Sequence, residues 1–173
     1  MAQTKYNYAP GRGIAGGIFD SFHYPVDSRW NEEENGKLSF GMGVVRGSIE
    51  GTNIALPTEA SAPIDFEGVI VNGFDRQMDL EGNLSILNNQ NVGVMRKGKI
   101  WVKIDSNAAP AYGDELHLIT SGENAGLFAT EGGIKISGRF IGSADGNIAP
   151  VELYGIDDSA EAAKASPSAD AIN

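Results

Sequence analysis

The stretch that decides the fold is residues 92–104, which read VGVMRKGKIWVKI. Two short apolar runs flank Lys97-Gly98, a pair that is typical of a tight turn between two strands. The second run alternates in the period-2 pattern of a half-buried β-strand, which gives it one apolar face and one mixed face. The stretch therefore predicts a β-hairpin, and the buried face of its second strand would be Ile100, Val102 and Ile104.

Short strands of the same kind extend in both directions from this stretch. The chain has 23 glycines, which break helices but suit the turns and bulges of a small barrel. Strands at such spacing, with turn signals between them, predict an all-β fold, either a small β-barrel or a barrel-like sandwich. The candidate strands are Leu38–Arg46, Asn53–Leu56, Glu67–Val71, Val92–Arg96, Lys99–Ile104, Glu115–Thr120, Gly126–Ala129, Ile134–Ile141 and Ala149–Tyr154.

The composition changes at both ends of this β-rich region. Residues 1–30 are rich in Gly, Pro and aromatic residues and show neither a helical nor a strand period. Residues 156–173 are rich in Ala, Ser and Asp and contain no aromatic residue, which is typical of a flexible tail. We therefore divide the chain into an extended N-terminal arm (1–30), a β-barrel body (31–155) and a flexible C-terminal tail (156–173).

The N-terminal arm holds six of the fourteen aromatic residues (seven Phe, five Tyr and two Trp in all). Large rings need a surface to bury against, and a segment without a core of its own must find that surface elsewhere. We interpret the arm as an attachment element that lies on a partner. The alternative is an ordered wrap over the barrel of the same chain. The candidate contact residues are Tyr6, Tyr8, Phe19, Phe22, Tyr24 and Trp30.

The composition excludes several classes of protein. The net charge of −10 repels phosphate, so we expect no direct nucleic-acid binding. No apolar run approaches the roughly 18 residues of a membrane span, so we expect no membrane contact, and the start lacks the apolar region of a signal peptide. The chain has no cysteine, which excludes disulfides and thiol chemistry.

The sequence offers no catalytic constellation, so we expect no enzyme activity, no cofactor and no metal site. The two histidines, His23 and His117, lie far apart and form no metal-ligand spacing. Residues 11–16 match the dinucleotide pattern G-x-G-x-x-G as letters, but that motif needs a preceding strand and a following helix, which are absent here.

The order of the body motifs resembles that of the structural cement, or capsid decoration, proteins of tailed bacteriophages. The resemblance covers about residues 10–154, although the segment 72–91 is longer than expected and the tail is extra. No single motif is specific, and the ordered set carries the resemblance. The matching segments are FGMGVVRG at 40–47, FEGVIV at 66–71, VGVMRKGKIWV at 92–102, AYGDELHL at 111–118, GLF at 126–128, GRFIG at 138–142 and APVEL at 149–153.

This resemblance implies a non-enzymatic protein of the virion that binds the outer surface of an assembled phage head. It also implies a homotrimer whose partner is the major capsid protein, made in the host cytoplasm and stabilising the head against internal DNA pressure. Two other readings stay open, a phage-associated adhesion module that binds carbohydrate or a receptor, and a β-barrel interaction protein outside phages. A third alternative is a carrier domain whose modified lysine would be Lys97, because this residue lies at the predicted hairpin.

Overall fold

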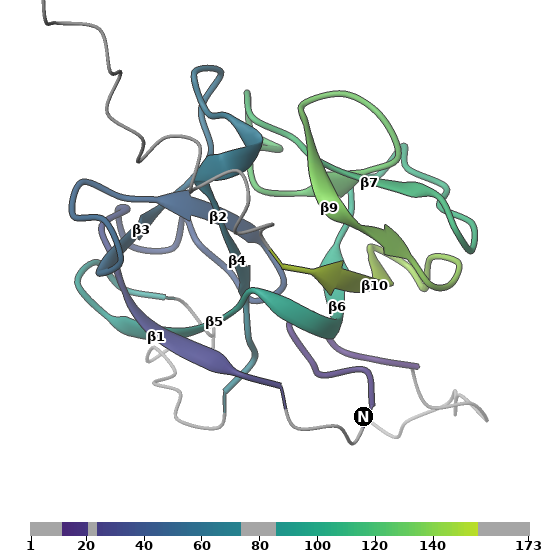
Figure 1. The fold of residues 1–173 in the computed structure, drawn as a ribbon, viewed down its shortest axis with the longest axis horizontal. Helices are drawn as coiled ribbons and strands as arrows, with labels where there is room; N and C mark the ends of the chain where they lie inside the picture. The colour runs from purple at the N-terminus through teal and green to yellow at the C-terminus, as the bar shows by residue number, and fades with distance from the viewer. Residues whose placement is uncertain (1–11, 21–23, 74–85, 156–173) are drawn as a thin grey trace, which may run out of the picture.

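A computed structural model describes residues 12–20, 24–73 and 86–155 (Figure 1). The regular structure in these residues is β, apart from one 3-10 turn, η1 (Pro63–Asp65), so the all-β prediction is confirmed. The strands are β1 (Val26–Asn31), β2 (Gly43–Arg46), β3 (Asn53–Ala55), β4 (Phe66–Ile70), β5 (Asn91–Met95), β6 (Lys97–Lys103), β7 (Glu115–Leu118), β8 (Phe128–Ala129), β9 (Ile134–Phe140) and β10 (Ile148–Tyr154).

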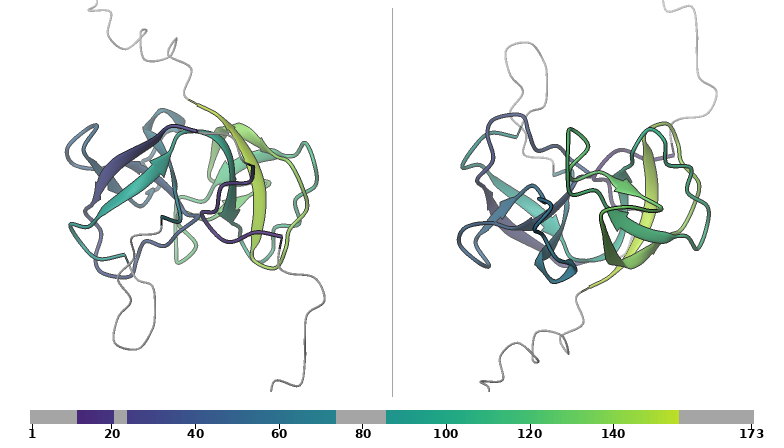
Figure 2. Two further views of the ribbon diagram at one scale, coloured as in Figure 1. Left: turned by 90° about the horizontal axis from the view of Figure 1, so that it is seen from below. Right: turned by 90° about the horizontal axis from the view of Figure 1, so that it is seen from above.

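The strands form two sheets that lie side by side, as two rolls of β-structure in Figure 2. The first, on the left of Figure 1, is a closed barrel with the order β1-β3-β2-β4-β5. The second has the order β6-β10-β9-β7-β8, and it curls until its outer strands meet, since Ile104 after β6 bridges to Phe128 of β8. The body therefore combines a small closed barrel with a curled second sheet.

The hairpin predicted around Lys97-Gly98 is wrong. β5 pairs with β1 and β4 in the barrel, whereas β6 pairs with β10 in the second sheet. The chain bends at Arg96 and continues from one sheet into the other. Gly98 has a φ of +134°, and the Cγ of Tyr24 lies 2.5 Å from where a Cβ would stand. The glycine is needed for the close approach of this ring and not for a tight turn.

The barrel includes a strand that the sequence did not predict. Residues 26–31 form β1, which pairs antiparallel with β5 and parallel with β3. The boundary drawn at residue 30 between arm and body therefore falls inside a barrel strand. The strand was missed because its apolar residues, Val26 and Trp30, are exposed, while the less exposed positions hold Asp27, Arg29 and Asn31. This pattern inverts the usual apolar-inward alternation.

Strand β4 separates two apolar cores, and all five of its residues are buried. Phe66 and Val69 join the larger core, which the inner face of the second sheet completes, while Ile70 joins the smaller core inside the barrel. Each fully buried large apolar side chain contributes roughly 1.5–3 kcal/mol before the entropy cost of folding. The predicted inward face is confirmed, because Ile100 and Val102 of β6 are 0% exposed and Ile104, just after β6, is 3% exposed.

Candidate functional site

The candidate site was the set of six rings in the N-terminal arm, and the structure describes half of them. The ring of Phe19 lies on the second sheet, Tyr24 lies at the β5–β6 bend, and Trp30 lies on β1 of the barrel. These three rings are therefore spread over both sheets of their own chain. The other three candidates, Tyr6, Tyr8 and Phe22, lie outside the described residues.

Residues 12–20 run along the edge of β6, where Figure 1 shows them in purple. The backbone N–H of Gly16 donates to the oxygen of Trp101 at 2.8 Å, and the N–H of Trp101 donates to the oxygen of Gly17 at 2.9 Å. The N–H of Phe19 donates to the oxygen of Lys99 at 3.0 Å, which extends the pairing. An unpaired sheet edge is prone to pair with other chains, and this segment covers it. For residues 12–20 the structure thus favours the wrap on the same chain.

The ring of Phe19 leans on the indole of Trp101, with their centroids 5.7 Å apart and their planes tilted by 38°. Gly13 lies on the same indole, so that a Cβ there would stand 2.2 Å from a ring carbon. Trp101 is thereby almost wholly buried, whereas Phe19 remains 43% exposed. A groove of about 410 Å³ opens beside the two rings, and its lining includes Arg12, Ile141 and Pro150.

Tyr24 is part of the body's own packing. Its ring packs against the larger core and fills the space above Gly98, and its hydroxyl donates to the carboxylate of Asp20 at 3.0 Å. Burial and this contact with Asp20 raise the pKa of the Tyr24 phenol. Asp20 also lies 3.6 Å from the Nζ of Lys99. Asp20 and Tyr24 are thus both fixed to the second sheet.

Trp30 presents a different surface, on the barrel. Its backbone N–H donates to the oxygen of Thr52 at 2.9 Å, which fixes the strand, while 47% of the residue stays exposed. Among the described arm rings, Phe19 and Trp30 therefore retain surface for a partner, and they belong to different sheets.

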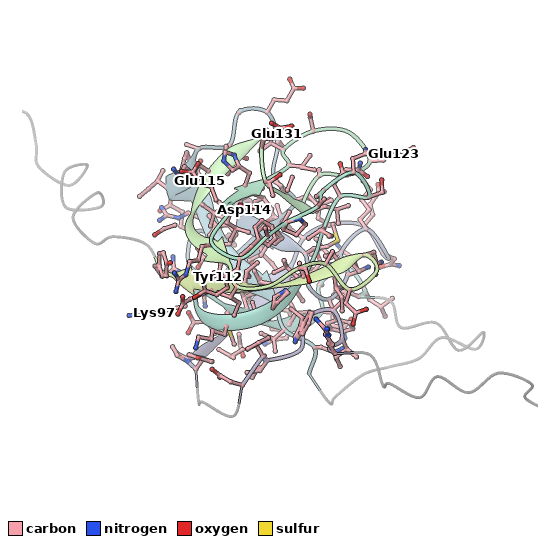
Figure 3. The ribbon with its side chains drawn as sticks, turned by 90° about the vertical axis from the view of Figure 1, so that its right-hand side faces the viewer. Lys97, Tyr112, Asp114, Glu115, Glu123 and Glu131 are labelled. Carbon is pink, nitrogen blue, oxygen red and sulfur yellow. The ribbon has the colours of Figure 1, made fainter. Side chains whose placement is uncertain are left out.

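The outer face of the second sheet carries a second group of exposed aromatic and charged residues. Tyr112 is 69% exposed, and its ring stacks on the guanidinium of Arg139, 5.5 Å from the centroid. Arg139 donates from Nε and Nη2 to one oxygen of Glu152, at 3.0 and 2.9 Å. The hydrogen bond to Glu152, helped by Tyr112 and Tyr154, raises the pKa of Arg139. Figure 3 shows Lys97 and Tyr112 at one end of this side and Glu123 and Glu131 at the other.

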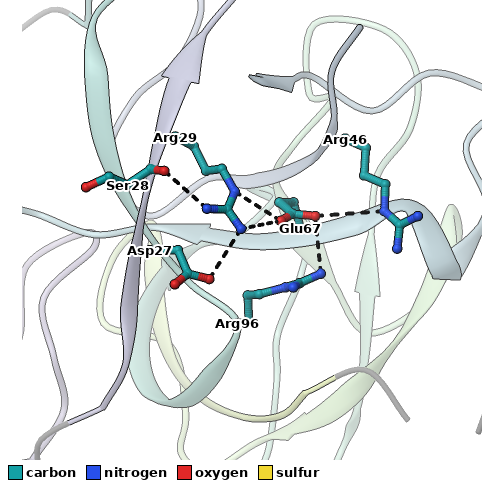
Figure 4. A network of polar contacts seen from close by, with 6 residues as sticks. All are labelled: Asp27, Ser28, Arg29, Arg46, Glu67 and Arg96. Atoms are coloured by element: carbon teal, nitrogen blue, oxygen red, sulfur yellow. Dashed lines mark hydrogen bonds and ion pairs between the residues drawn. The ribbon is translucent and has the colours of Figure 1, made fainter. Parts of the chain in front are cut away.

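Inside the barrel, one buried carboxylate gathers three arginines (Figure 4). Glu67 of β4 is 3% exposed and accepts two hydrogen bonds from Arg29 of β1, at 3.1 and 2.9 Å. Arg96, at the bend between the sheets, donates to its other oxygen at 3.2 Å, and the Nε of Arg46 lies 3.9 Å away. Arg29 also contacts the carboxylate of Asp27 at 3.3 Å. The cluster ties β1, β2 and β4 to the start of the second sheet.

The remaining polar groups form surface networks. His117 of β7 bonds through Nδ1 to the oxygen of Gly132 at 2.9 Å, and its Nε2 lies 3.7 Å from Glu115, which also binds Lys135. The hydrogen bond from Lys135 lowers the pKa of Glu115. The described residues contain no group of three or more His, Asp or Glu side chains placed to hold a metal ion. No described helix is long and apolar enough to cross a membrane.

A family model described as "Structural cement protein (E217 gp24/Pam3 gp6)" matches residues 2–154. The chain belongs to this family. The match ends at the last residue of β10, so both sheets of the cement protein lie within it, as does the arm from residue 2. The resemblance inferred from the ordered motifs is thereby confirmed.

A chain in the solved structure "The capsid of Myoviridae Phage XM1" is similar to the cement protein in fold. The TM-score is 0.68 at 17% sequence identity, and the match covers 88% of this chain and 97% of that chain. At this low sequence identity, the structural similarity is evidence for a shared fold only. No curated protein matches the chain.

Sequence reasoning missed the Glu67 cluster and the stacked Tyr112 and Arg139 of the cement protein. The sequence did contain a signal for the Glu67 cluster, because a charged residue in the apolar stretch FEGVI needs a buried partner. The partners themselves come from strands far apart in sequence, so only the fold brings them together. The alternative that the protein is a carrier domain modified at Lys97 required this residue to lie at a hairpin tip. Lys97 instead begins β6, opposite Tyr154, so this alternative is no longer supported.

Proposed function

We propose that this cement protein is a capsid decoration protein that binds the outer surface of the assembled phage head and stabilises it against internal DNA pressure. The observation that carries the proposal is the family match along both sheets and most of the arm. Because the match is to a structural cement protein, the alternative of a carbohydrate- or receptor-binding adhesion module is not favoured.

The proposed partner is the major capsid protein, and the proposed working form is a homotrimer. Several weak contacts that are joined in one assembly give a long-lived attachment, because each further contact forms at a high effective concentration. The acidic body, with its chain charge of −10, argues against DNA as the partner. The protein would be made in the host cytoplasm and act in the virion, with no catalytic step and no cofactor.

The arm remains the proposed attachment element in a narrower form. Tyr24 is engaged by its own chain, and residues 12–20 cover the edge of β6. We therefore assign capsid contact to the exposed surfaces of Phe19 and Trp30, together with Tyr6 and Tyr8. Phe22 is retained as a candidate contact residue. Burying one ring contributes roughly 1.5–3 kcal/mol before ordering costs, so a few rings per subunit suffice when several subunits act together.

The stabilising effect would arise by linkage. A ligand that binds the assembled lattice, but not free capsid subunits, opposes disassembly by about 2.7 kcal/mol per site when its free concentration is a hundredfold above Kd. The test compares heads with and without the cement protein during heating and osmotic shock. Bare heads should release DNA at a lower temperature, and adding the protein back should restore resistance. Equal stability of the two particles, with the protein bound, would contradict a cement role.

A further inference from the structure

The first half of β1 has one open edge. In the barrel β1 lies between β5 and β3, but the two pairings differ in length. Among the described strands, residues 26–30 pair with β5, whereas only Trp30 and Asn31 pair with β3. In this part of the structure the first half of β1 therefore has a strand on one side only, and we call residues 26–28 the β1 edge. An open edge presents backbone groups to which another strand can pair.

The hydrogen bonds at the end of β1 show which backbone groups face the open side. In a strand, the N–H and C=O of one residue point to one side and those of the next residue point to the other. The N–H of Asn31 donates to the oxygen of Gln90 on the β5 side, at 2.9 Å. The N–H of Trp30 donates to the oxygen of Thr52 on the β3 side, also at 2.9 Å. By this alternation, the even-numbered residues of β1 point to the β3 side.

Val26 and Ser28 therefore point to the side where β3 does not reach. Within the described residues, the N–H groups of Val26 and Ser28 and the oxygen of Val26 are left without a hydrogen bond. The oxygen of Ser28 accepts from Nη1 of Arg29 at 3.1 Å. Pro25, which has no N–H, precedes Val26 and ends the row of donors. The β1 edge thus offers two donors and one acceptor in the spacing of a strand.

The side chains beside these groups carry no charge. Val26 is 42% exposed and Trp30 is 47% exposed, and the exposed Ser28 lies between them. The charged residues of β1, Asp27 and Arg29, lie on its other face and contact each other at 3.3 Å. Figure 4 shows Ser28 on the opposite side of β1 from this contact. Proteins commonly protect an open edge with charged side chains, and this edge instead presents apolar ones.

The free groups specify the chemistry of the partner. Two N–H donors and one acceptor in a row are complementary to an extended backbone, which pairs by adding a strand to the edge. Apolar side chains at alternate positions of that strand would pack on Val26 and Trp30.

A second copy of the chain fits this edge less well than another protein does. Two identical edges pair about a twofold axis, whereas the proposed homotrimer needs contacts between different surfaces. Two bodies that each carry a net charge of −10 also repel each other. Trp30, which continues the β1 edge, is already proposed as a capsid contact.

We infer that the β1 edge binds an extended strand of the capsid protein, which joins the barrel beside Val26 and Ser28. The inference rests on the proposed function, and it names how the capsid protein is recognised next to Trp30. Backbone hydrogen bonds hold the added strand, and the side chains of Val26 and Trp30 select apolar residues in it.

The first experiment uses the full chain and the phage's own heads purified without the cement protein. Ser28→Pro removes one donor of the edge, and Ser28→Ala is its matched control, since it keeps the N–H. A proline is tolerated on an edge where the N–H faces solvent, and Asp27 before it is already extended, so the melting temperature should stay close to wild type. Co-sedimentation should show a Kd about fivefold higher or more for Ser28→Pro, and within about twofold of wild type for Ser28→Ala.

A second measurement needs no substitution. Amide hydrogen exchange of the wild-type protein is compared between the free and the head-bound forms. We expect the amides of Val26 and Ser28 to exchange rapidly in the free protein and about tenfold more slowly or less on heads. The amide of Asn31 is the internal control, because it is already bonded to Gln90 and should be protected in both forms.

The outcomes separate this inference from the function on which it rests. If wild type does not bind heads, the proposed function fails. If wild type binds while a folded Ser28→Pro binds as tightly as Ser28→Ala, the β1 edge is not the contact and the inference fails alone. If Ser28→Pro does not fold, hydrogen exchange decides, and unchanged exchange at Val26 and Ser28 on heads overturns the inference. Protection of both amides in the free protein, with a lower oligomer mass for Ser28→Pro, would make a second copy the occupant and also overturn it.

Discussion

The carboxylate of Glu67 on β4 is joined to the guanidinium of Arg29 on β1 by two hydrogen bonds, at 3.1 and 2.9 Å. β1 and β4 are not neighbours in the barrel, since each pairs separately with β5. The contact therefore crosses the barrel interior next to β5. An ion pair in this position adds a specific link between strands that backbone hydrogen bonds do not connect.

Glu67→Gln should destabilise the protein strongly. Removing one partner of a buried ion pair leaves the other charge uncompensated, which costs about 3 kcal/mol or more. Here the loss leaves Arg29, Arg46 and Arg96 gathered around a neutral amide. The free energy of unfolding in urea measures the effect.

The control for this variant is Glu152→Gln, which breaks a more exposed pair with Arg139. Exposed pairs contribute about 1 kcal/mol or less, so the control should lose far less stability. Equal losses for the two variants would mean that the barrel cluster adds nothing beyond an ordinary surface ion pair.

Gly13→Ala should disturb the packing of Trp101. The new Cβ would stand 2.2 Å from a ring carbon, so the segment or the indole must move, at a cost of about 1–3 kcal/mol. The expected result is a lower melting temperature and a red-shifted tryptophan fluorescence. Gly73→Ala is the matched control, since a Cβ there meets nothing within 4 Å. Unchanged fluorescence in Gly13→Ala would contradict the close packing of residue 13 on Trp101.

Removing residues 1–20 should lower stability and promote aggregation, because it uncovers the edge of β6 at Lys99 and Trp101. Removing only residues 1–11 leaves every one of these backbone hydrogen bonds in place. Melting temperature and light scattering compare the two truncated proteins. If both behave alike, the pairing of residues 16–19 with β6 does not protect the edge.

The fold class and most strands were predictable because apolar alternation and glycine turns are local signals. The inward face of β6 followed directly from the alternation in residues 100–104. Strand β1 was not predictable by the same rule, since the less exposed side of its alternation carries Arg29 and Asn31. These polar side chains are satisfied by Glu67 and by the backbone oxygen of Leu87, which lie far away in sequence.

The hairpin was wrongly predicted for a related reason. Gly98 looked like a turn residue, but its role is to admit the ring of Tyr24, which comes from a segment more than seventy residues earlier. A glycine that is required by tertiary contact cannot be told from a turn glycine by local sequence. The same limit applies to Trp101, whose burial depends on Gly13 and Phe19 and not on its own strand.

Acid should remove a contribution to stability that Glu32 makes at neutral pH. Burial acts to raise the pKa of this carboxyl, but hydrogen bonds from Ser48 and Asn53 outweigh it, so the pKa lies below its ordinary value of 4.5. The hydroxyl of Ser48 donates at 2.7 Å, its N–H at 2.8 and 3.0 Å, and the amide of Asn53 at 3.0 Å. A group whose pKa is lowered by folding stabilises the protein above its ordinary pKa, and this contribution fades as the pH falls through the folded value.

Glu32→Gln should therefore be less stable than wild type at pH 6, and the gap between them should shrink steadily towards pH 3. Urea unfolding at a series of pH values measures both free energies. Glu59→Gln, at an exposed carboxylate, serves as the control and should follow wild type across the series. A gap for Glu32→Gln that stays constant from pH 6 to pH 3 would show that the hydrogen bonds of Ser48 and Asn53 do not depend on the charge of Glu32. In that case uncharged hydrogen bonds would hold residue 32, just after β1, to the β2–β3 turn equally well.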